Sequence, residues 1–289
     1  MLKNLGSLFV SLFATSALAE GFEQIAIVQD GRIDESSGMA ISRTHPDCLW
    51  IHNDSGDKPR LFLVEQTGET RAVVKIDDAK AHDWEDMCSF EVDGKPYLLI
   101  GDFGDNNKVR DKDNRPCSLY LVEEPSVPEG KDEIEVEYRA RIKFTYEDGS
   151  RNCESVAVDT VRKEILLLTK QTPENCGFYT MPLDLDDKKQ KRVAKRIADV
   201  PVPFATAMDL SPACDSLIII TQLSGFHVQR DAEESWDQAL SDWSVVQLPG
   251  RIQGETICFD RDGQRLFLNS EKSQQPLWLL KLPQPNADN

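Results

Sequence analysis

Short apolar runs separated by polar turns recur along this chain at a period of roughly 50 residues. Five of these runs open with an oxygen-bearing side chain and carry Met, Val or Ile two positions later. They span residues 37–41, 85–89, 154–158, 206–210 and 255–259. Runs this short, repeated at this period, predict β-strands in a repeat protein.

Each opening run is followed by further strand-like runs. In the first two repeats these are 49–52, 60–64 and 72–76, and then 97–100, 118–122 and 139–143. Four short strands per repeat are the signature of a β-propeller blade. The sequence therefore predicts an all-β fold, a five-bladed β-propeller of four-stranded blades.

The ends of the repeat array bear on the blade count. The last repeat lacks an outer strand, and the spare N-terminal strand at 23–28 can supply it and close the ring. The second repeat is long because it holds polar insertions at 107–115 and 123–132, which are typical of loops. Six blades are the alternative. No linker typical of a domain boundary interrupts the array, so residues 20–289 are expected to form one domain.

Residues 1–19 have the pattern of a signal peptide. Lys3 precedes an apolar stretch at 8–14, and Ala17 to Ala19 resembles a cleavage site. The apolar stretch is about half of the roughly 20 residues that a membrane-spanning helix needs. We therefore expect an exported protein, periplasmic or extracellular, with no membrane span.

The charge of the chain restricts its partners. It carries 33 basic and 50 acidic residues, a formal net charge of −17. Such a surface repels nucleic acids and anionic membranes and favours cations. We expect no nucleic-acid partner, and we expect a monomer.

Seven cysteines are present, and in an exported protein some should pair. Cys153 precedes a first strand and Cys176 a third strand of the same repeat, which predicts a Cys153–Cys176 disulfide, with Cys117 as the competing partner. The four histidines show no zinc-ligand spacing, so a zinc site is not expected.

Two acidic motifs mark a candidate ion site. They are HDWEDM at 82–87 and GDFGDN at 101–106. Hairpin-connected strands are antiparallel, so the start of a first strand and the end of a second strand lie at the same end of a blade, and the two motifs should meet there. First strands line the channel of a propeller, so their opening residues should form a ring at its mouth: Ser37, Glu85, Glu154, Thr206 and Glu255.

Three glutamates in one ring cannot all be ionised at close range without compensation, because like charges raise each other's pKa. Calcium would provide that compensation, since it takes about 6–8 oxygen ligands from carboxylates, carbonyls and hydroxyls. The alternative is that each glutamate accepts hydrogen bonds from the backbone of the neighbouring blade. The repetition at equivalent positions favours the ion.

The order Ser, Glu, Glu, Thr, Glu around the ring resembles that of the calcium-activated nucleotidases, the secreted apyrases. The segments 255–259 and 206–212 are similar to motifs of that family, with Thr206 in place of a Ser. The resemblance implies a five-bladed propeller with an axial calcium. The chain lacks the long substrate-facing insertions of that family, and its acidic motifs look like those of uncharacterised exported bacterial propellers.

Two functions remain open. The first is a calcium-dependent hydrolase of a phosphate ester or anhydride, with Asp54 or Asp102 orienting water. The side chains expected to contact its substrate are Lys58, Arg60, Asp105, Lys170 and Glu271. The second is a binding or scaffold propeller that recruits a protein or glycan, with a purely structural calcium. Convergence of basic side chains on the acidic ring would favour the hydrolase.

Overall fold

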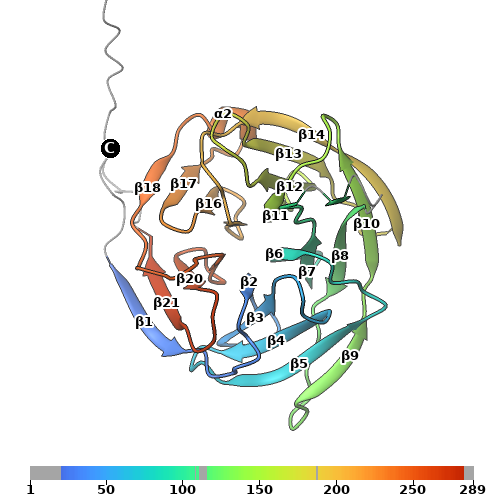
Figure 1. The fold of residues 1–289 in the computed structure, drawn as a ribbon, viewed down its shortest axis with the longest axis vertical. Helices are drawn as coiled ribbons and strands as arrows, with labels where there is room; N and C mark the ends of the chain where they lie inside the picture. Colours follow the sequence, from blue (N-terminus) through green and yellow to red (C-terminus); the bar gives the residue numbers. More distant parts are fainter. Residues whose placement is uncertain (1–20, 108, 111–115, 187, 283–289) are drawn as a thin grey trace, which may run out of the picture.

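The computed structural model describes residues 21–107, 109–110, 116–186 and 188–282. The predicted signal peptide lies outside the described residues. Nearly all of the regular structure in the described part of the chain is β-strand, as predicted, and the sheets are arranged around a central axis (Figure 1).

Four sheets make up the ring. The first consists, in spatial order, of β2 (Ser36–Ile41), β3 (Cys48–Asn53), β4 (Arg60–Glu65), β5 (Thr70–Asp77) and β9 (Glu133–Glu137). The second, of eight strands, consists of β11 (Cys153–Asp159), β12 (Glu164–Thr169), β13 (Gly177–Pro182), β14 (Lys189–Asp199), β10 (Ala140–Tyr146), β8 (Cys117–Glu123), β7 (Lys95–Asp102) and β6 (Trp84–Val92).

The two remaining sheets have four strands each. One consists of β15 (Ala207–Leu210), β16 (Ser216–Ile220), β17 (Gly225–Gln229) and β18 (Ser244–Val246), with the short helix α2 (Trp236–Ala239) between its last two strands. The other consists of β19 (Thr256–Phe259), β20 (Arg265–Asn269), β21 (Pro276–Lys281) and β1 (Phe22–Ile27). The antiparallel pairing of β1 with β21 confirms that the N-terminal strand completes the last sheet.

The predicted opening strands lie around the axis. In Figure 1, β2, β6 and β11 are nearest the centre, whereas β1, β5 and β14 are at the rim. Contacts between these opening strands run in a circuit from β2 to β6, β11, β15 and β19 and back to β2. The fold is therefore a β-propeller-like ring of sheets, with apolar clusters packed between neighbouring sheets.

Two parallel pairings at the rim were not predicted from the sequence. β14 pairs in parallel with β10 and so joins two antiparallel runs of four strands into the eight-stranded sheet. β9, which directly follows the second polar insertion, pairs in parallel with β5 and extends the first sheet by one strand. The insertion therefore ends in a strand that links neighbouring parts of the ring.

The predicted Cys153–Cys176 disulfide is wrong. Cys153 packs in an apolar cluster that includes residues of β8. Cys176 packs in a different apolar cluster, on the opposite face of strands β11 to β14. Each thiol donates to a backbone carbonyl, Cys153 Sγ to Leu168 O at 3.2 Å and Cys176 Sγ to Thr169 O at 3.0 Å. Side chains on opposite faces of one sheet cannot be bridged without moving the backbone.

Candidate functional site

The two acidic motifs meet at one end of the ring, as predicted. The carbonyl oxygen of Asp83, just before β6, accepts hydrogen bonds from the backbone N–H groups of Phe103 at 3.1 Å and Gly104 at 3.3 Å, just after β7. The loop after β3 contributes Asp54 to the same region. Antiparallel pairing of β6 with β7 places these segments together.

Three carboxylates converge here. Asp54, Asp83 and Glu85 each offer an oxygen, and these oxygens lie within 4.8 Å of one another. Glu85 is 2% exposed, and its Oε1 has no hydrogen-bond partner among the described residues. We call these three residues the acidic cluster. Its buried, unpartnered oxygen distinguishes it from a solvated group of surface acids.

Gly104 leaves room for the acidic cluster. A Cβ atom on this glycine would lie 1.9 Å from Glu85 Oε1 and 2.7 Å from Asp83 Oδ2. Both carboxylates therefore pack against the bare backbone of the second motif. Any side chain at this position would displace them.

Burial and mutual repulsion raise the pKa values in the acidic cluster. Burial is the main cause of raising the pKa of Asp54 to about 6, and it also raises the pKa of Asp83. The pKa of Glu85 lies well above its usual range, because of burial and then because of the negative charges of Glu154, Asp54 and Asp83. A bound cation would reverse this balance by stabilising the ionised carboxylates.

The residues of the predicted axial ring are buried, and three of them lie at bulges. The strand pairing shifts register between Ser36 and Gly38, between Trp84 and Met87, and between Cys153 and Ser155. These shifts fall at Ser37, Glu85 and Glu154. A bulge redirects a side chain relative to its strand, and bulges are common beside functional sites.

Lys170 lies between two ring glutamates. Its Nζ forms an ion pair with Glu154 and lies 3.7 Å from Glu255 Oε1. Burial raises the pKa of Glu154 to about 7 despite the nearby ammonium group. Thr206 Oγ1 donates to Gly254 O at 2.9 Å. Three of the five predicted ring residues, Glu154, Thr206 and Glu255, are therefore bound by a lysine or by backbone, whereas Glu85 turns toward Asp54 and Asp83.

Two acids, Asp102 at the end of β7 and Asp105 just after it, are held by partners within the protein. Asp102 is fully buried, and its Oδ1 accepts from Arg110 Nη2 at 2.8 Å and from the backbone N–H of Asp83 at 3.1 Å. Asp105 Oδ1 accepts from the backbone N–H groups of Val109 and Arg110 at 2.7 and 3.0 Å. Both carboxylates hold the loop that carries Gly104. The catalytic assignment of Asp54 and Asp102 stays a prediction.

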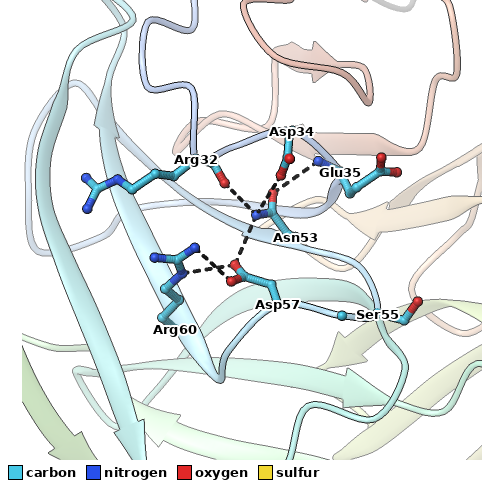
Figure 2. Close-up of a pocket in the computed structure, with 8 residues that line it drawn as sticks. Arg32, Asp34, Glu35, Asn53, Ser55, Asp57 and Arg60 are labelled. Atoms are coloured by element: carbon cyan, nitrogen blue, oxygen red, sulfur yellow. Dashed lines mark hydrogen bonds and ion pairs between the residues drawn. The ribbon is translucent and has the colours of Figure 1, made fainter.

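Arg60 lies in a different pocket, a hollow of about 380 Å³ beside the loop that carries Asp54 (Figure 2). Its guanidinium group is paired with Asp57 at 2.7 Å and stacks on Phe62. Asn53 holds the base of this pocket by donating to Arg32 O and to Asp57 Oδ2 (Figure 2). The predicted substrate contacts are thus divided between separate places.

None of the other predicted contacts is among the residues that line the Arg60 pocket. Lys58 is exposed. Glu271 is buried and its Oε2 lies 3.1 Å from Lys272 Nζ, and burial is the main cause of raising its pKa to about 8. Asp105 and Lys170 line a second cavity, of about 270 Å³.

Two buried acids at the axis were not singled out from the sequence. Asp86 is fully buried and accepts backbone N–H groups from Met87, Val156 and Met208, at 2.8, 2.9 and 3.2 Å. Asp209 accepts from the backbone N–H of Phe259 at 2.8 Å. Each therefore ties its own strand to the opening strand of another sheet. The signal in the sequence that could have identified both residues is an acidic residue inside an otherwise largely apolar opening run.

Asp209 should make stability depend on pH. Burial is the main cause of raising its pKa to about 7 from an ordinary value of 3.8, so the folded protein retains a proton that the unfolded chain releases. This contribution to stability is complete below the ordinary value and is lost as the pH rises through about 7.

The variant Asp209→Asn stays neutral at every pH. We therefore expect the wild-type protein to lose stability relative to this variant between about pH 4 and about pH 7 in urea unfolding, and the difference to level off above that range. Parallel curves for the two proteins would contradict the raised pKa.

No family model matches this chain, and no curated protein matches it. Among solved structures, a WD40 domain of Pan2 from Neurospora crassa is 11% identical over 91% of this chain and 96% of that one, with a TM-score of 0.46. A protein of unknown function from Bacteroides thetaiotaomicron is 9% identical over 91% and 76%, also at 0.46. A nidogen/laminin complex is 9% identical over 82% and 72%, again at 0.46.

These TM-scores are too low to carry an argument, so the propeller-like assignment rests on the sheet topology. The comparisons thus give no support to the resemblance to the calcium-activated nucleotidases. In the part of the chain that the structure describes, no helix is long and apolar enough to cross a membrane.

Proposed function

We propose that this chain is an exported, five-bladed propeller that holds a divalent cation, calcium, in the acidic cluster and binds a ligand on the same face. The blade count is supported by the circuit of opening strands β2, β6, β11, β15 and β19. It is also supported by the eight-stranded sheet, which divides at the parallel pair of β10 and β14 into two antiparallel runs.

The observation that carries the cation proposal is the unpartnered Oε1 of Glu85, buried beside two other carboxylates. A buried charged oxygen without a partner costs several kcal/mol unless it is protonated or bound to a positive charge. Asp54, Asp83 and Glu85 would hold the ion, and water or ligand oxygens would complete its shell. All-oxygen donors on flexible carboxylates suit calcium better than magnesium, which needs a near-ideal octahedron.

Export would keep such a site occupied. Extracellular calcium modules bind with dissociation constants of about 10⁻⁴ to 10⁻³ M, which suits a site with three protein carboxylates. The resemblance to calcium-activated nucleotidases would place the ion on the axial ring instead. Lys170 already compensates Glu154 and Glu255 there, which favours the acidic cluster.

Binding is favoured over phosphoester hydrolysis. Of the predicted basic contacts, Lys170 reaches the ring, but it is paired with two glutamates, and Arg60 is paired with Asp57. Asp102, proposed to orient water, is paired with Arg110. A hydrolase would need uncommitted positive charge and an accessible acid beside the ion. We therefore expect no calcium-dependent release of phosphate from nucleotides.

Calcium titration by calorimetry tests the proposal. The wild-type protein should bind calcium, and Glu85→Gln should weaken binding by at least about tenfold, the loss typical of disturbing even an outer partner of a metal ligand. Gly104→Ala should weaken binding as well, because its methyl group would displace the Glu85 and Asp83 carboxylates. Adding chelator to the calcium-loaded protein should lower its melting temperature.

Two control variants locate the ion. Glu174→Gln removes an exposed charge outside the acidic cluster and should leave calcium affinity nearly unchanged. Glu154→Gln separates the two candidate positions. A loss equal to that of Glu85→Gln would place the ion on the axial ring, and a wild-type protein that binds no calcium would refute the proposal.

A further inference from the structure

The cavity of about 270 Å³ lies on an acidic face, yet most of the side chains that line it are basic, uncharged and polar, or aromatic. It is lined in part by Asp105, Arg151, Lys170, Gln171 and Phe204. Its volume lies just below the range of about 300–1,000 Å³ for drug-sized ligand sites, so it fits a ligand of about one ring. None of its lining residues belongs to the acidic cluster.

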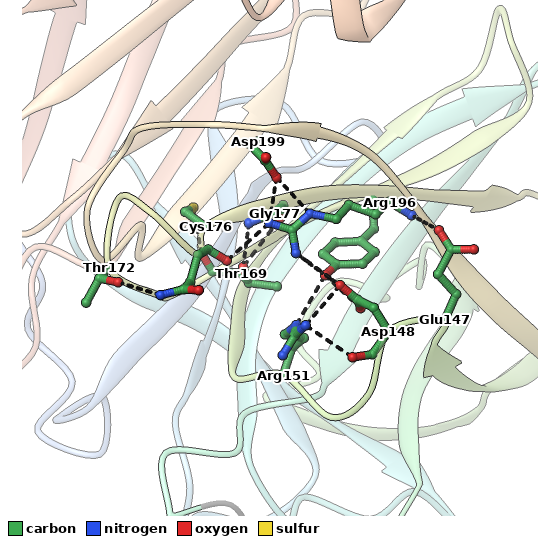
Figure 3. Close-up of polar contacts among 11 residues, drawn as sticks. Glu147, Asp148, Arg151, Thr169, Thr172, Cys176, Gly177, Arg196 and Asp199 are labelled. Atoms are coloured by element: carbon green, nitrogen blue, oxygen red, sulfur yellow. Dashed lines mark hydrogen bonds and ion pairs between the residues drawn. The ribbon is translucent and has the colours of Figure 1, made fainter.

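Each of the charged side chains that line the cavity is already ion-paired or hydrogen-bonded within the described residues. Lys170 is paired with Glu154 and Glu255. Arg151 is paired with Asp148 at 2.9 Å and donates to Tyr179 Oη at 3.2 Å (Figure 3).

Asp148 is held in turn by Tyr179 and by Arg196, whose guanidinium group stacks on the Tyr179 ring. Asp105 accepts two backbone N–H groups and the hydroxyl of Ser150. The cavity therefore offers no unpaired basic group to a ligand.

Two uncharged groups in the wall are uncommitted. The side-chain amide of Gln171 makes no hydrogen bond among the described residues. The second is Phe204, which is 53% exposed. These two residues are held side by side, because the backbone N–H of Phe204 donates to Gln171 O at 2.9 Å.

Phe204 is held in a strained conformation. Its φ is 53°, in the left-handed region that a bulky L-residue rarely adopts. Strain of this kind persists where surrounding structure imposes it, and it gathers at ligand sites. Here the strained residue stays about half exposed, so its aromatic ring lacks full burial. The apolar face of a ligand would supply that burial.

We propose that this cavity binds a neutral, polyhydroxylated ligand of the saccharide type, with one sugar ring stacked on Phe204 and its hydroxyls hydrogen-bonded to Gln171. A pyranose has one face of C–H groups, which packs on an aromatic ring, and an edge of hydroxyls, which pairs with amides. Phosphorylated ligands are disfavoured, because the basic groups of the wall are already paired and the chain as a whole carries a charge of −17.

Saturation-transfer NMR and calorimetry test this with glucose, galactose, mannose, N-acetylglucosamine and their disaccharides as probes, with and without chelator. At least one neutral saccharide should bind in the millimolar range, and its 6-phosphate should bind more weakly. Binding should persist in chelator, which separates this inference from the cation proposal. Phe204→Ala and Gln171→Ala should each weaken binding, the former by about tenfold or more.

Phe204→Gly distinguishes a binding role from a structural one. Glycine adopts positive φ without strain, so the melting temperature should be unchanged or higher while saccharide binding is lost. Leu223→Ala is the matched control, since Leu223 is 85% exposed but does not line the cavity. Binding of no neutral saccharide, stronger binding of the phosphorylated forms, or binding that Phe204→Gly leaves intact would overturn the inference.

Discussion

Replacing Asp86 by alanine is expected to lower the free energy of unfolding by about 3–5 kcal/mol, because it would leave three buried backbone N–H groups without an acceptor. These N–H groups belong to Met87 on β6, Val156 on β11 and Met208 on β15. A loss of this size corresponds to a fall of about 6–20 °C in melting temperature. Thermal and urea unfolding measure it.

Asp86→Asn is the matched variant. Its amide oxygen can still accept from Val156 and Met208, so most of the stability should remain. If the alanine variant were as stable as the wild type, the axial hydrogen bonds would not hold the opening strands together. If the asparagine variant lost as much as the alanine variant, the negative charge rather than the acceptor would matter.

Replacing Arg110 by alanine should cost a similar amount. Arg110 and Asp102 form a buried ion pair at 2.8 Å, with side chains 4% and 0% exposed. Removing one member of a buried pair leaves the other charge uncompensated, at about 3–5 kcal/mol. Arg110 also donates to the carbonyl oxygens of Gly104 and Pro116. The variant should therefore also weaken calcium binding by loosening the backbone beside Glu85.

A double-mutant cycle separates these effects. In the Arg110→Ala background, Asp102→Asn removes the uncompensated charge and should restore part of the lost stability. It should not restore calcium affinity, because the anchor of Gly104 is still absent. If the two substitutions acted additively on stability, the ion pair would not be the source of the loss.

The sheets could be predicted from the sequence because each opening strand repeats one pattern of apolar and oxygen-bearing positions. β9 and the parallel pairs could not. The two strands of each parallel pair are far apart in the chain, and their pairing produces no repeated pattern in the sequence. The eight-stranded sheet therefore forms through the long-range pairing of β10 with β14, which the local sequence pattern does not predict.

The sequence predicted where the candidate site lies, but not which side chains contact one another within it. Glu85 and the meeting of the two acidic motifs follow from antiparallel geometry. Asp83 as a partner of Glu85 does not, because the bulge between Trp84 and Met87 decides which way these side chains turn. The pairing of Lys170 with Glu154 depends on a contact between a loop and a neighbouring strand start, which no spacing in the sequence specifies.

The rim strand β9 also bears on association between copies of this chain. A strand at the edge of a sheet presents unpaired backbone groups on which another chain can add a strand. Here the edge reads Glu-Ile-Glu-Val-Glu, and its three glutamates are exposed. A second copy that approached edge to edge would bring like charges into register and would be repelled. The insertion thus widens the first sheet and ends it in a strand that resists aggregation.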